Sequence, residues 1–290
     1  MIQDFSSFIL HPSSLRLLVT GGSGYLGSAI LKRAPRGWTL AATYLTQPLT
    51  AENVAAFRLD VRDAGQVDRV IAGWRPDVIV HTAAHQRGEQ MRAVNADGSQ
   101  HIASAAAREN ARLIHLSSDV IFDGEHAPYD ESALPDPISP YAESKALAER
   151  AVVDAHPQPA IIRTSLIYGF APLDPRTRQT LDGEMPRLFT DEYRCPILVD
   201  DLADALLELA TSGYSGILNV AGPQRLSRYD FGVKLAHALG VEPRFAPALS
   251  APTETSRPRD CTLDISRAQT LLRTRLRGVD QVLQSLISNL

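Results

Sequence analysis

The sequence is poor in cysteine, in surplus positive charge and in long apolar stretches, and each shortage narrows what the protein can be. Cys195 and Cys261 are its two cysteines and neither belongs to a Cys-x-x-Cys motif, so a disulfide framework is excluded and a reducing compartment is expected. No run reaches the roughly 18 apolar residues of a membrane helix, and the first residues lack the basic segment of a secretion signal. A net charge of −4 gives no reason to expect nucleic acid or an anionic membrane as a partner.

Strand and helix patterns alternate along the first 170 residues. Short apolar runs such as Leu15–Val19 and Pro76–His81 have the composition of buried strands, and Ala64–Trp74 between them has helical spacing. This alternation predicts an α/β fold, a doubly wound parallel sheet of Rossmann-like type with a smaller C-terminal substrate lobe. The expected division is a leader at 1–14, a dinucleotide-binding domain at 15–169 and a substrate-binding lobe at 170–290, interwoven with the first domain, in which 170–188 is a loop over the site.

A glycine-rich turn follows the first strand. Gly21 permits a tight turn, Gly24 leaves room for the pyrophosphate of a dinucleotide, and Gly27 lets the next helix pack closely on the strand. The helix that begins here directs free N–H groups at the anion. A connector without a ligand is the alternative, but the strand before the turn and the helix after it favour a dinucleotide. The cofactor-binding residues predicted from this turn are Gly21, Ser23, Gly24, Tyr25, Leu26 and Gly27.

The end of the second strand, about 20 residues further on, distinguishes NAD from NADP. A carboxylate there would accept a hydrogen bond from the ribose 2′-hydroxyl and would repel a 2′-phosphate. The chain has Thr43-Tyr44-Leu45, which favours NADP, while NAD stays open because no arginine adjoins this segment to bind the phosphate. Asp60 and Val61, after the third strand, are placed to meet the adenine, with a simple strand-end turn as an equal alternative.

Ser118, Tyr141 and Lys145 are the candidate catalytic residues. Tyr141 and Lys145 are four residues apart on a helix expected from Pro140, so their side chains share one face. A phenol with a pKa near ~10 transfers protons poorly at neutral pH, and a nearby ammonium should lower that pKa. Ser118, at the end of the fifth strand, would hydrogen-bond the substrate oxygen. Each residue alone has a structural explanation, as a core aromatic, a solvated cation or a turn serine, but their order after a dinucleotide turn favours catalysis.

The remaining polar residues suggest fewer roles. His81 and His85 lie across a strand end and not on one helix, so no metal site is expected. Asn95 is interpreted as a helix residue whose side chain hydrogen-bonds the backbone, and not as a catalyst. The planar guanidinium of Arg257 suits the diphosphate of a nucleotide substrate, and the alternative is that Arg257 pairs with a carboxylate and braces the lobe.

The motifs together resemble the extended short-chain dehydrogenases/reductases. Landmarks of that superfamily are the glycine turn, the pair Ala83-Ala84 after the fourth strand, Asn95 in its Val-Asn-x-x-Gly setting and the Tyr-x-x-x-Lys motif. More narrowly, the segments Leu116–Gly124 and Arg257–Asp264 are similar to the dTDP-4-dehydrorhamnose reductase group. The resemblance extends over nearly the whole chain from Leu15.

This resemblance implies a cofactor site, a catalytic set and an activity. Ser118 would supply the catalytic hydroxyl, Tyr141 the acid and Lys145 a contact to the nicotinamide ribose, while Asp119 would lie at the substrate. Ala83 and Ala84 would border the cofactor. The implied activity is NADP(H)-dependent reduction of a 4-keto-6-deoxy sugar nucleotide, as in dTDP-rhamnose biosynthesis.

One segment departs from the reductase pattern. Arg194-Cys195-Pro196 stands where reductases have a run like Gly-Ser-Pro, and it is closer to the regulatory subunit of methionine adenosyltransferase. A non-catalytic cofactor-binding regulatory protein, or another sugar-nucleotide epimerase or dehydratase, therefore stays as an alternative. The expected partner is a nucleotide-sugar substrate, with no nucleic acid and no membrane, in the cytoplasm. A homodimer is compatible with the sequence, which does not fix the oligomeric state.

Overall fold

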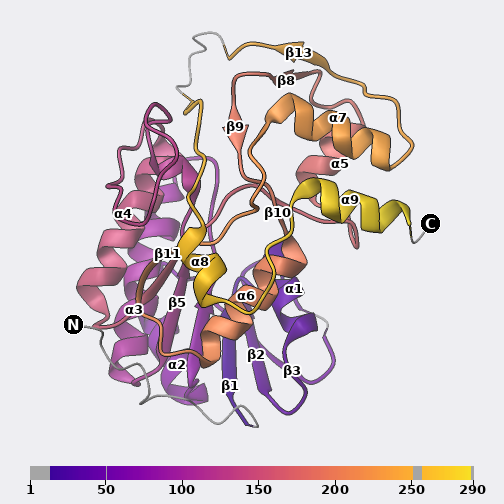
Figure 1. Ribbon diagram of the computed structural model, residues 1–290. Helices are drawn as coiled ribbons and strands as arrows, with labels where there is room; N and C mark the ends of the chain where they lie inside the picture. Colours follow the sequence, from indigo (N-terminus) through magenta and orange to yellow (C-terminus); the bar gives the residue numbers. More distant parts are fainter. Residues whose placement is uncertain (1–13, 50, 251–256, 289–290) are drawn as a thin grey trace.

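The computed structural model describes residues 14–49, 51–250 and 257–288. A sheet of seven parallel strands forms its centre, in the spatial order β11-β6-β5-β4-β1-β2-β3 (Figure 1). This order and the intervening helices confirm the predicted doubly wound, Rossmann-like α/β fold. The strands of the sheet are β1 (Arg16–Thr20), β2 (Thr39–Tyr44), β3 (Val54–Arg58), β4 (Val78–His81), β5 (Arg112–Leu116), β6 (Ala160–Arg163) and β11 (Gly216–Asn219).

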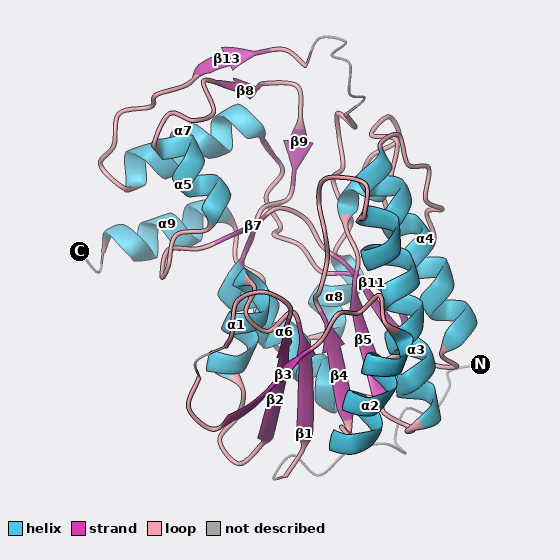
Figure 2. Ribbon diagram, turned by 180° about the vertical axis from the view of Figure 1, so that it is seen from behind, coloured by secondary structure: helices cyan, strands magenta, loops and turns pink. Residues whose placement is uncertain are grey.

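Helices cover both faces of the sheet. The central strands are apolar on both sides: in β1, Leu17 and Val19 pack in the core shared with α1 (Tyr25–Arg33) and α6 (Val199–Thr211). Leu18 between them packs in the opposite core, with residues of α2 (Ala64–Trp74) and α3 (Gly98–Arg108). The helix α4 (Pro140–Ala155) runs beside α3 on that second face (Figure 2). This double burial explains why the strands appear in the sequence as continuous apolar runs.

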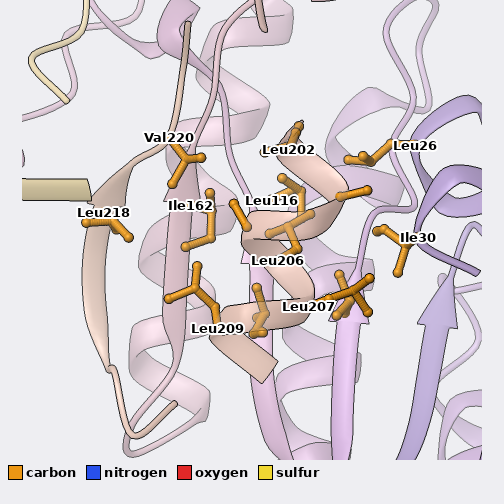
Figure 3. Close-up of a cluster of buried hydrophobic side chains, with 14 of the residues drawn as sticks. Leu26, Ile30, Leu116, Ile162, Leu202, Leu206, Leu207, Leu209, Leu218 and Val220 are labelled. Atoms are coloured by element: carbon orange, nitrogen blue, oxygen red, sulfur yellow. The ribbon is translucent and has the colours of Figure 1, made fainter. Parts of the chain in front are cut away.

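The helix α6 shows how the later part of the chain returns to the first core. Its residues Leu202, Leu206 and Leu209 are fully buried, and they gather with side chains of α1 and of the strand region around β5, β6 and β11 (Figure 3). Each fully buried leucine contributes roughly 1.5–3 kcal/mol. The late strand β11 likewise pairs in parallel with β6, so residues beyond 200 complete both the sheet and its cover.

The C-terminal lobe lies beyond the carboxyl edge of the sheet (Figure 1). Its strands pair two by two, and three helices pack beside them. Among the helices in the described ranges, none is long and apolar enough to cross a membrane. The elements of the lobe are β7 (Ile167–Tyr168), α5 (Pro175–Leu181), β8 (Arg187–Phe189), β9 (Tyr193–Arg194), β10 (Ile197–Leu198), β12 (Leu226–Ser227), α7 (Arg228–Ala238), β13 (Ala246–Ala248) and α9 (Val279–Ile287), and α8 (Ser266–Leu271) packs near β11.

One expectation about local structure was wrong. The segment 170–188 is not only a loop, because it contains α5 and the start of β8. Asp174 caps α5 by accepting a hydrogen bond from Thr177 N at 2.8 Å, and Pro175 occupies the first helical position, a start signal present in the sequence. The expected leader at 1–14 lies, except for its last residue, outside the described residues.

Candidate active site

The glycine turn between β1 and α1 lies at the carboxyl edge of the sheet. Gly21 has φ +70°, and a Cβ there would lie 2.9 Å from the backbone of Ala83. A Cβ at Gly27 would lie 2.3 Å from the Gly21 carbonyl oxygen, so both positions exclude larger residues. Gly24 is exposed at the N-cap of α1 and offers no side chain to the first N–H groups of the helix. These groups therefore stay accessible to an anion, and the turn fits the pyrophosphate of a dinucleotide.

The ends of β2 and β4 are attached to this turn. Thr43 at the end of β2 is buried; Gly21 N donates to its Oγ1 at 3.2 Å and Gly22 N donates to its carbonyl oxygen at 2.9 Å. Ala83 after β4 lies against Gly21, and Ala84 beside it is exposed. The direction of the strand order changes between β1 and β4, which is where ligands bind in open α/β sheets.

Asp60 and Val61, predicted to meet the adenine, both have structural contacts of their own. The Asp60 carboxylate accepts hydrogen bonds from Arg62, with Nε at 2.9 Å, and this pairing lowers the pKa of Asp60. Val61 is buried against the first residue of α3, where a Cβ on Gly98 would lie 2.7 Å from its Cγ2. The contact with adenine stays a prediction.

Ser118 lies two residues after the end of β5 and is half-buried. Its hydroxyl oxygen caps the short turn Asp119–Ile121 by accepting from Val120 N at 3.5 Å, and its Oγ also lies 3.3 Å from Asp119 Oδ1. The structure therefore gives Ser118 the turn-forming role of the alternative interpretation. It also places the hydroxyl at the carboxyl edge of the sheet, where a substrate oxygen would lie.

Tyr141 and Lys145 lie on one face of α4, in its first turns. The helix begins behind Ser139, whose hydroxyl accepts from Ala142 N at 3.3 Å. Lys145 is buried and its Nζ donates to the carbonyl oxygen of Leu116, the last residue of β5, at 2.5 Å. This bond fixes the start of α4 against the end of β5, so Tyr141, Lys145 and Ser118 are brought to the same edge of the sheet.

The pKa values of these groups contradict one expectation. Burial, with an added contribution from the negative charge of Asp119, raises the pKa of Tyr141 to about 12, so it is not lowered by Lys145. Burial lowers the pKa of Lys145 to about 8, against the opposing charge of Glu149. The reason is physical: loss of hydration on burial disfavours the charged phenolate, and the negative charge of Asp119 disfavours it further.

Asn95 lies in a π-helical turn (Ala93–Asp97) that directly precedes α3. Its side chain receives a hydrogen bond from His85 N at 2.7 Å and donates to His85 O at 2.8 Å and to Ser144 Oγ at 2.9 Å. The Asn95 side chain thus hydrogen-bonds the backbone, as interpreted from the sequence. Its additional hydrogen bond to Ser144 connects this turn to α4 between Tyr141 and Lys145. Single π turns are frequent near functional sites.

The loop after β7 covers the glycine turn. The Tyr25 hydroxyl donates to Pro172 O at 3.1 Å, and burial raises the pKa of Tyr25 above its ordinary value. A cavity of about 500 Å³ lies here, between Ser23 and Gly24 on one side and the 172–184 segment on the other. Part of the segment predicted to lie over the site does so, although it is partly helical.

Guanidinium groups gather in the lobe beside the carboxyl edge of the sheet. Burial lowers the pKa of Arg228 to about 9, and the charges of Arg176 and Arg194 lower it further. The pKa of Arg176 is also lowered by burial, and next by Arg257; its Nε is buried and has no partner among the described residues. Arg257 Nη1 lies 3.9 Å from the buried Glu192 Oε1, which accepts no hydrogen bond within those residues.

This cluster carries more positive than negative charge. Four guanidinium groups face the two buried carboxylates of Glu192 and Asp119. The contact between Arg257 and Glu192 is the pairing with a carboxylate that the sequence left as the alternative for Arg257. Glu192 alone cannot neutralise the arginines around it. A cationic cluster with an unpaired buried N–H group is suited to an anionic ligand.

The family described as RmlD substrate binding domain matches residues 15–290. The chain belongs to this family. It is 33% identical to dTDP-4-dehydrorhamnose reductase of Mycobacterium tuberculosis, over 88% of the chain and 86% of the relative. It is 27% identical to methionine adenosyltransferase 2 subunit beta of Bos taurus, over 88% and 82%.

Solved structures give the same result for the fold. A hypothetical dTDP-4-dehydrorhamnose reductase from Sulfolobus tokodaii is 29% identical, with a TM-score of 0.81 over 93% of this chain and 99% of that one. A dTDP-4-dehydrorhamnose reductase from Bacillus anthracis in complex with NADP has the same TM-score over 96% and 100%, and at 22% identity it shows the fold alone. The resemblance to the extended short-chain reductases is confirmed.

Arg194 belongs to the segment expected to depart from the reductase pattern, and it is held by contacts of its own. Its guanidinium is buried; Nη2 donates to Pro258 O at 3.0 Å and Nη1 donates to Tyr193 O at 2.6 Å. Its Nε lies 3.9 Å from Asp119 Oδ2, which also accepts from Ser165 Oγ at 2.6 Å. Burial raises the pKa of Asp119, and Arg194 opposes that shift. Arg194 thus links the residue after Ser118 to the segment that carries Arg257.

Proposed function

We propose that this RmlD-family protein is an NADP(H)-dependent reductase of a 4-keto-6-deoxy sugar nucleotide, a substrate of the dTDP-4-dehydrorhamnose type. The observation that carries the proposal is the meeting of Ser118, Tyr141 and Lys145 at the carboxyl edge of the sheet, next to a glycine turn that fits a dinucleotide. Two relatives named dTDP-4-dehydrorhamnose reductase and dTDP-4-keto-6-deoxy-D-glucose reductase support the substrate class.

The cofactor would be held by the backbone at the turn and by polar groups around it. Gly21, Gly24 and Gly27 leave space for the pyrophosphate, and Ala83 borders it from β4. Lys145, on α4, would contact the nicotinamide ribose. When bound, the reduced cofactor supplies the hydride that the sugar carbonyl carbon receives.

The protein's residues would supply the proton and polarise the carbonyl. Ser118 donates a hydrogen bond to the C4 oxygen, which favours the negative charge that builds there as the hydride arrives. Tyr141, whose raised pKa keeps it protonated at neutral pH, donates its proton to that oxygen, so the ketone becomes an alcohol. Lys145 and the ribose hydroxyl would relay the proton that restores Tyr141.

The substrate diphosphate would bind to the guanidinium cluster. Arg257 is the residue expected from the sequence, and Arg176 and Arg228 join it from α5 and α7. The two negative charges of a diphosphate linkage match the surplus of guanidinium over carboxylate groups. Asp119, which receives hydrogen bonds and lies beside Ser118, would border the sugar.

The test is a turnover assay with NADPH and dTDP-4-dehydrorhamnose or dTDP-4-keto-6-deoxyglucose, following NADPH oxidation. We expect multiple turnovers with at least one of these sugars and no turnover with the corresponding 4-hydroxy sugar. Tight binding of NADPH without turnover of either sugar would favour the regulatory alternative, which the 27% identity to methionine adenosyltransferase 2 subunit beta keeps in view.

The division at residue 169 between a cofactor domain and a substrate lobe is part of this proposal, because the glycine turn lies before that residue and the guanidinium cluster after it. A cytoplasmic location accords with Cys195 and Cys261, which are buried and free. A homodimer is tested by light scattering of the purified protein.

A further inference from the structure

The sheet brings to the end of β2 an arginine that the linear sequence does not place there. β3 pairs with β2 in parallel, and the register sets Arg58 opposite Tyr44, the last residue of β2. Arg58 Nε donates to the carbonyl oxygen of Leu45 at 3.3 Å. The expectation that no arginine adjoins this segment was therefore wrong, because the neighbour belongs to the next strand and lies 13 residues away in sequence.

The guanidinium of Arg58 is exposed and available to a ligand. No carboxylate within residues 14–49, 51–250 and 257–288 lies within ion-pair distance of it; Asp60, two residues on, is paired with Arg62. The bond to Leu45 uses Nε and directs the group toward the end of β2. Its two Nη atoms, which carry four N–H donors, make no hydrogen bond within the described part of the chain.

Arg58 lies where the adenosine ribose of a dinucleotide would be contacted, beside the end of β2. Gly21 and Gly22 bond to Thr43, so the end of β2 adjoins the pyrophosphate turn. In this fold the residue at the end of the second strand contacts the adenosine 2′-position, where a carboxylate selects NAD and an arginine accommodates the 2′-phosphate of NADP. Tyr44 and Leu45 supply no carboxylate there, and a guanidinium can bind phosphate through two parallel N–H groups.

We infer that Arg58 binds the 2′-phosphate of NADP(H) and sets the preference of this protein for NADPH over NADH. The inference rests on the proposed function for the presence of a dinucleotide, and it adds the residue that selects between the two cofactors.

The test measures the dissociation constants of NADPH and NADH by fluorescence titration, without sugar substrate. Arg58→Ala should weaken NADPH binding about tenfold or more, as expected for the loss of charge-assisted hydrogen bonds, and leave NADH within about twofold. Arg58→Glu should reverse the preference, because a carboxylate accepts from the 2′-hydroxyl and repels the phosphate. Arg69→Ala, at an exposed arginine of α2 with no ion pair in the described residues, is the matched control and should change neither constant.

Two results overturn the inference and separate it from the proposed function. If the Arg58 variants bind both cofactors as the unchanged protein does, or lose both equally, Arg58 does not read the 2′-phosphate, while the proposed function stands. If the unchanged protein binds neither cofactor, the proposed function and the inference both fail. A thermal melt of each variant checks that the exposed substitution leaves the fold intact.

Discussion

The glycine turn and the guanidinium cluster are built by opposite means. At the turn, the fit to a ligand depends on missing side chains: a Cβ at Gly21 or Gly27 would meet backbone at 2.9 or 2.3 Å. In the lobe, the fit depends on long charged side chains from four segments, including Arg228 and Arg257, around Glu192. The first site uses neutral N–H groups that need no counterion, and the second holds buried charge that is only partly compensated.

The difference has an energetic consequence. Backbone N–H groups at a helix start are fixed by the fold, so binding an anion there costs little ordering. Arg176 and Arg228 are half-buried, and their lowered pKa values show that burial disfavours their charged state, so the lobe is less stable without an anion than with one. Ligand binding should therefore stabilise the lobe more than the turn. Substitutions in the lobe should change KM for the nucleotide sugar, and substitutions in the turn should change the dissociation constant of NADPH.

The largest effect is expected where the two regions meet. Tyr141→Phe removes only the proton donor, so kcat should fall about 10²–10⁴-fold, the usual contribution of a general acid. The NADPH dissociation constant should stay within about twofold, because the ring still packs. Stopped-flow turnover and a fluorescence titration measure the two quantities. Near-native turnover with a reducible sugar would show that another group delivers the proton.

In the lobe, Arg257→Ala should raise KM for the nucleotide sugar about 10- to 30-fold, since it removes charge-assisted hydrogen bonds to the diphosphate. The NADPH constant should not change. Arg259→Ala removes the same charge two residues away and is the control, with an expected change below about threefold. Equal effects of the two substitutions would mean that the lobe contributes only its overall charge.

At the turn, Gly24→Ala and Gly27→Ala should behave differently. A Cβ at the exposed Gly24 would lie 3.0 Å from the Gly21 oxygen, so the fold should persist while NADPH binding weakens about tenfold. At Gly27 the same atom would lie 2.3 Å from that oxygen, so the melting temperature should also fall by several degrees. Calorimetry with a cofactor titration separates the two outcomes, and an unaltered NADPH constant in Gly24→Ala would place the pyrophosphate elsewhere.

The smallest effect concerns the stability of the site itself. Because burial lowers the pKa of Lys145 to about 8 from 10.5, the folded protein binds fewer protons than the unfolded chain between these values, and its stability rises with pH across that window. Lys145→Met should therefore stabilise the fold by about 1–2 kcal/mol at pH 7, after allowing for the lost bond to Leu116.

That gain should shrink as the pH rises from 8 to 10.5, because the lysine then becomes neutral in both states. Chemical denaturation at several pH values measures it. A Lys145→Met protein that is less stable than the original at pH 7 would show that the ammonium is well compensated where it lies.

The turn could be predicted from the sequence and the cluster could not, for a physical reason. Steric demands at Gly21, Gly24 and Gly27 fall within one short segment, so they leave a spaced motif. The cluster joins Arg176, Arg194, Arg228 and Arg257, which are far apart in sequence and meet only through the lobe's strand pairs and helices. Of these four arginines the sequence pointed only to Arg257, which begins a segment similar to the reductase group.

The same reason explains the other differences. The central strands of the sheet were recognisable because both of their faces are buried, as Leu17 and Leu18 show in β1. The two-residue strands of the lobe, such as β9, are too short to carry any periodicity. The raised pKa of Tyr141 depends on burial and on Asp119, which the spacing of tyrosine and lysine does not reveal. Likewise Arg58 adjoins Leu45 only through the register of β2 and β3.

The central claim is that hydride transfer takes place at the meeting point of the turn and the cluster. The most direct measurement uses NADPH deuterated at nicotinamide C4, on the side from which it is transferred, with dTDP-4-dehydrorhamnose, and locates the label by NMR. The account predicts one deuterium at C4 of the sugar and a hydroxyl in place of the carbonyl, and the same labelled product formed about 10²–10⁴-fold more slowly with Tyr141→Phe. Bound NADPH that keeps its deuterium over many hours, with the sugar unchanged, would contradict it.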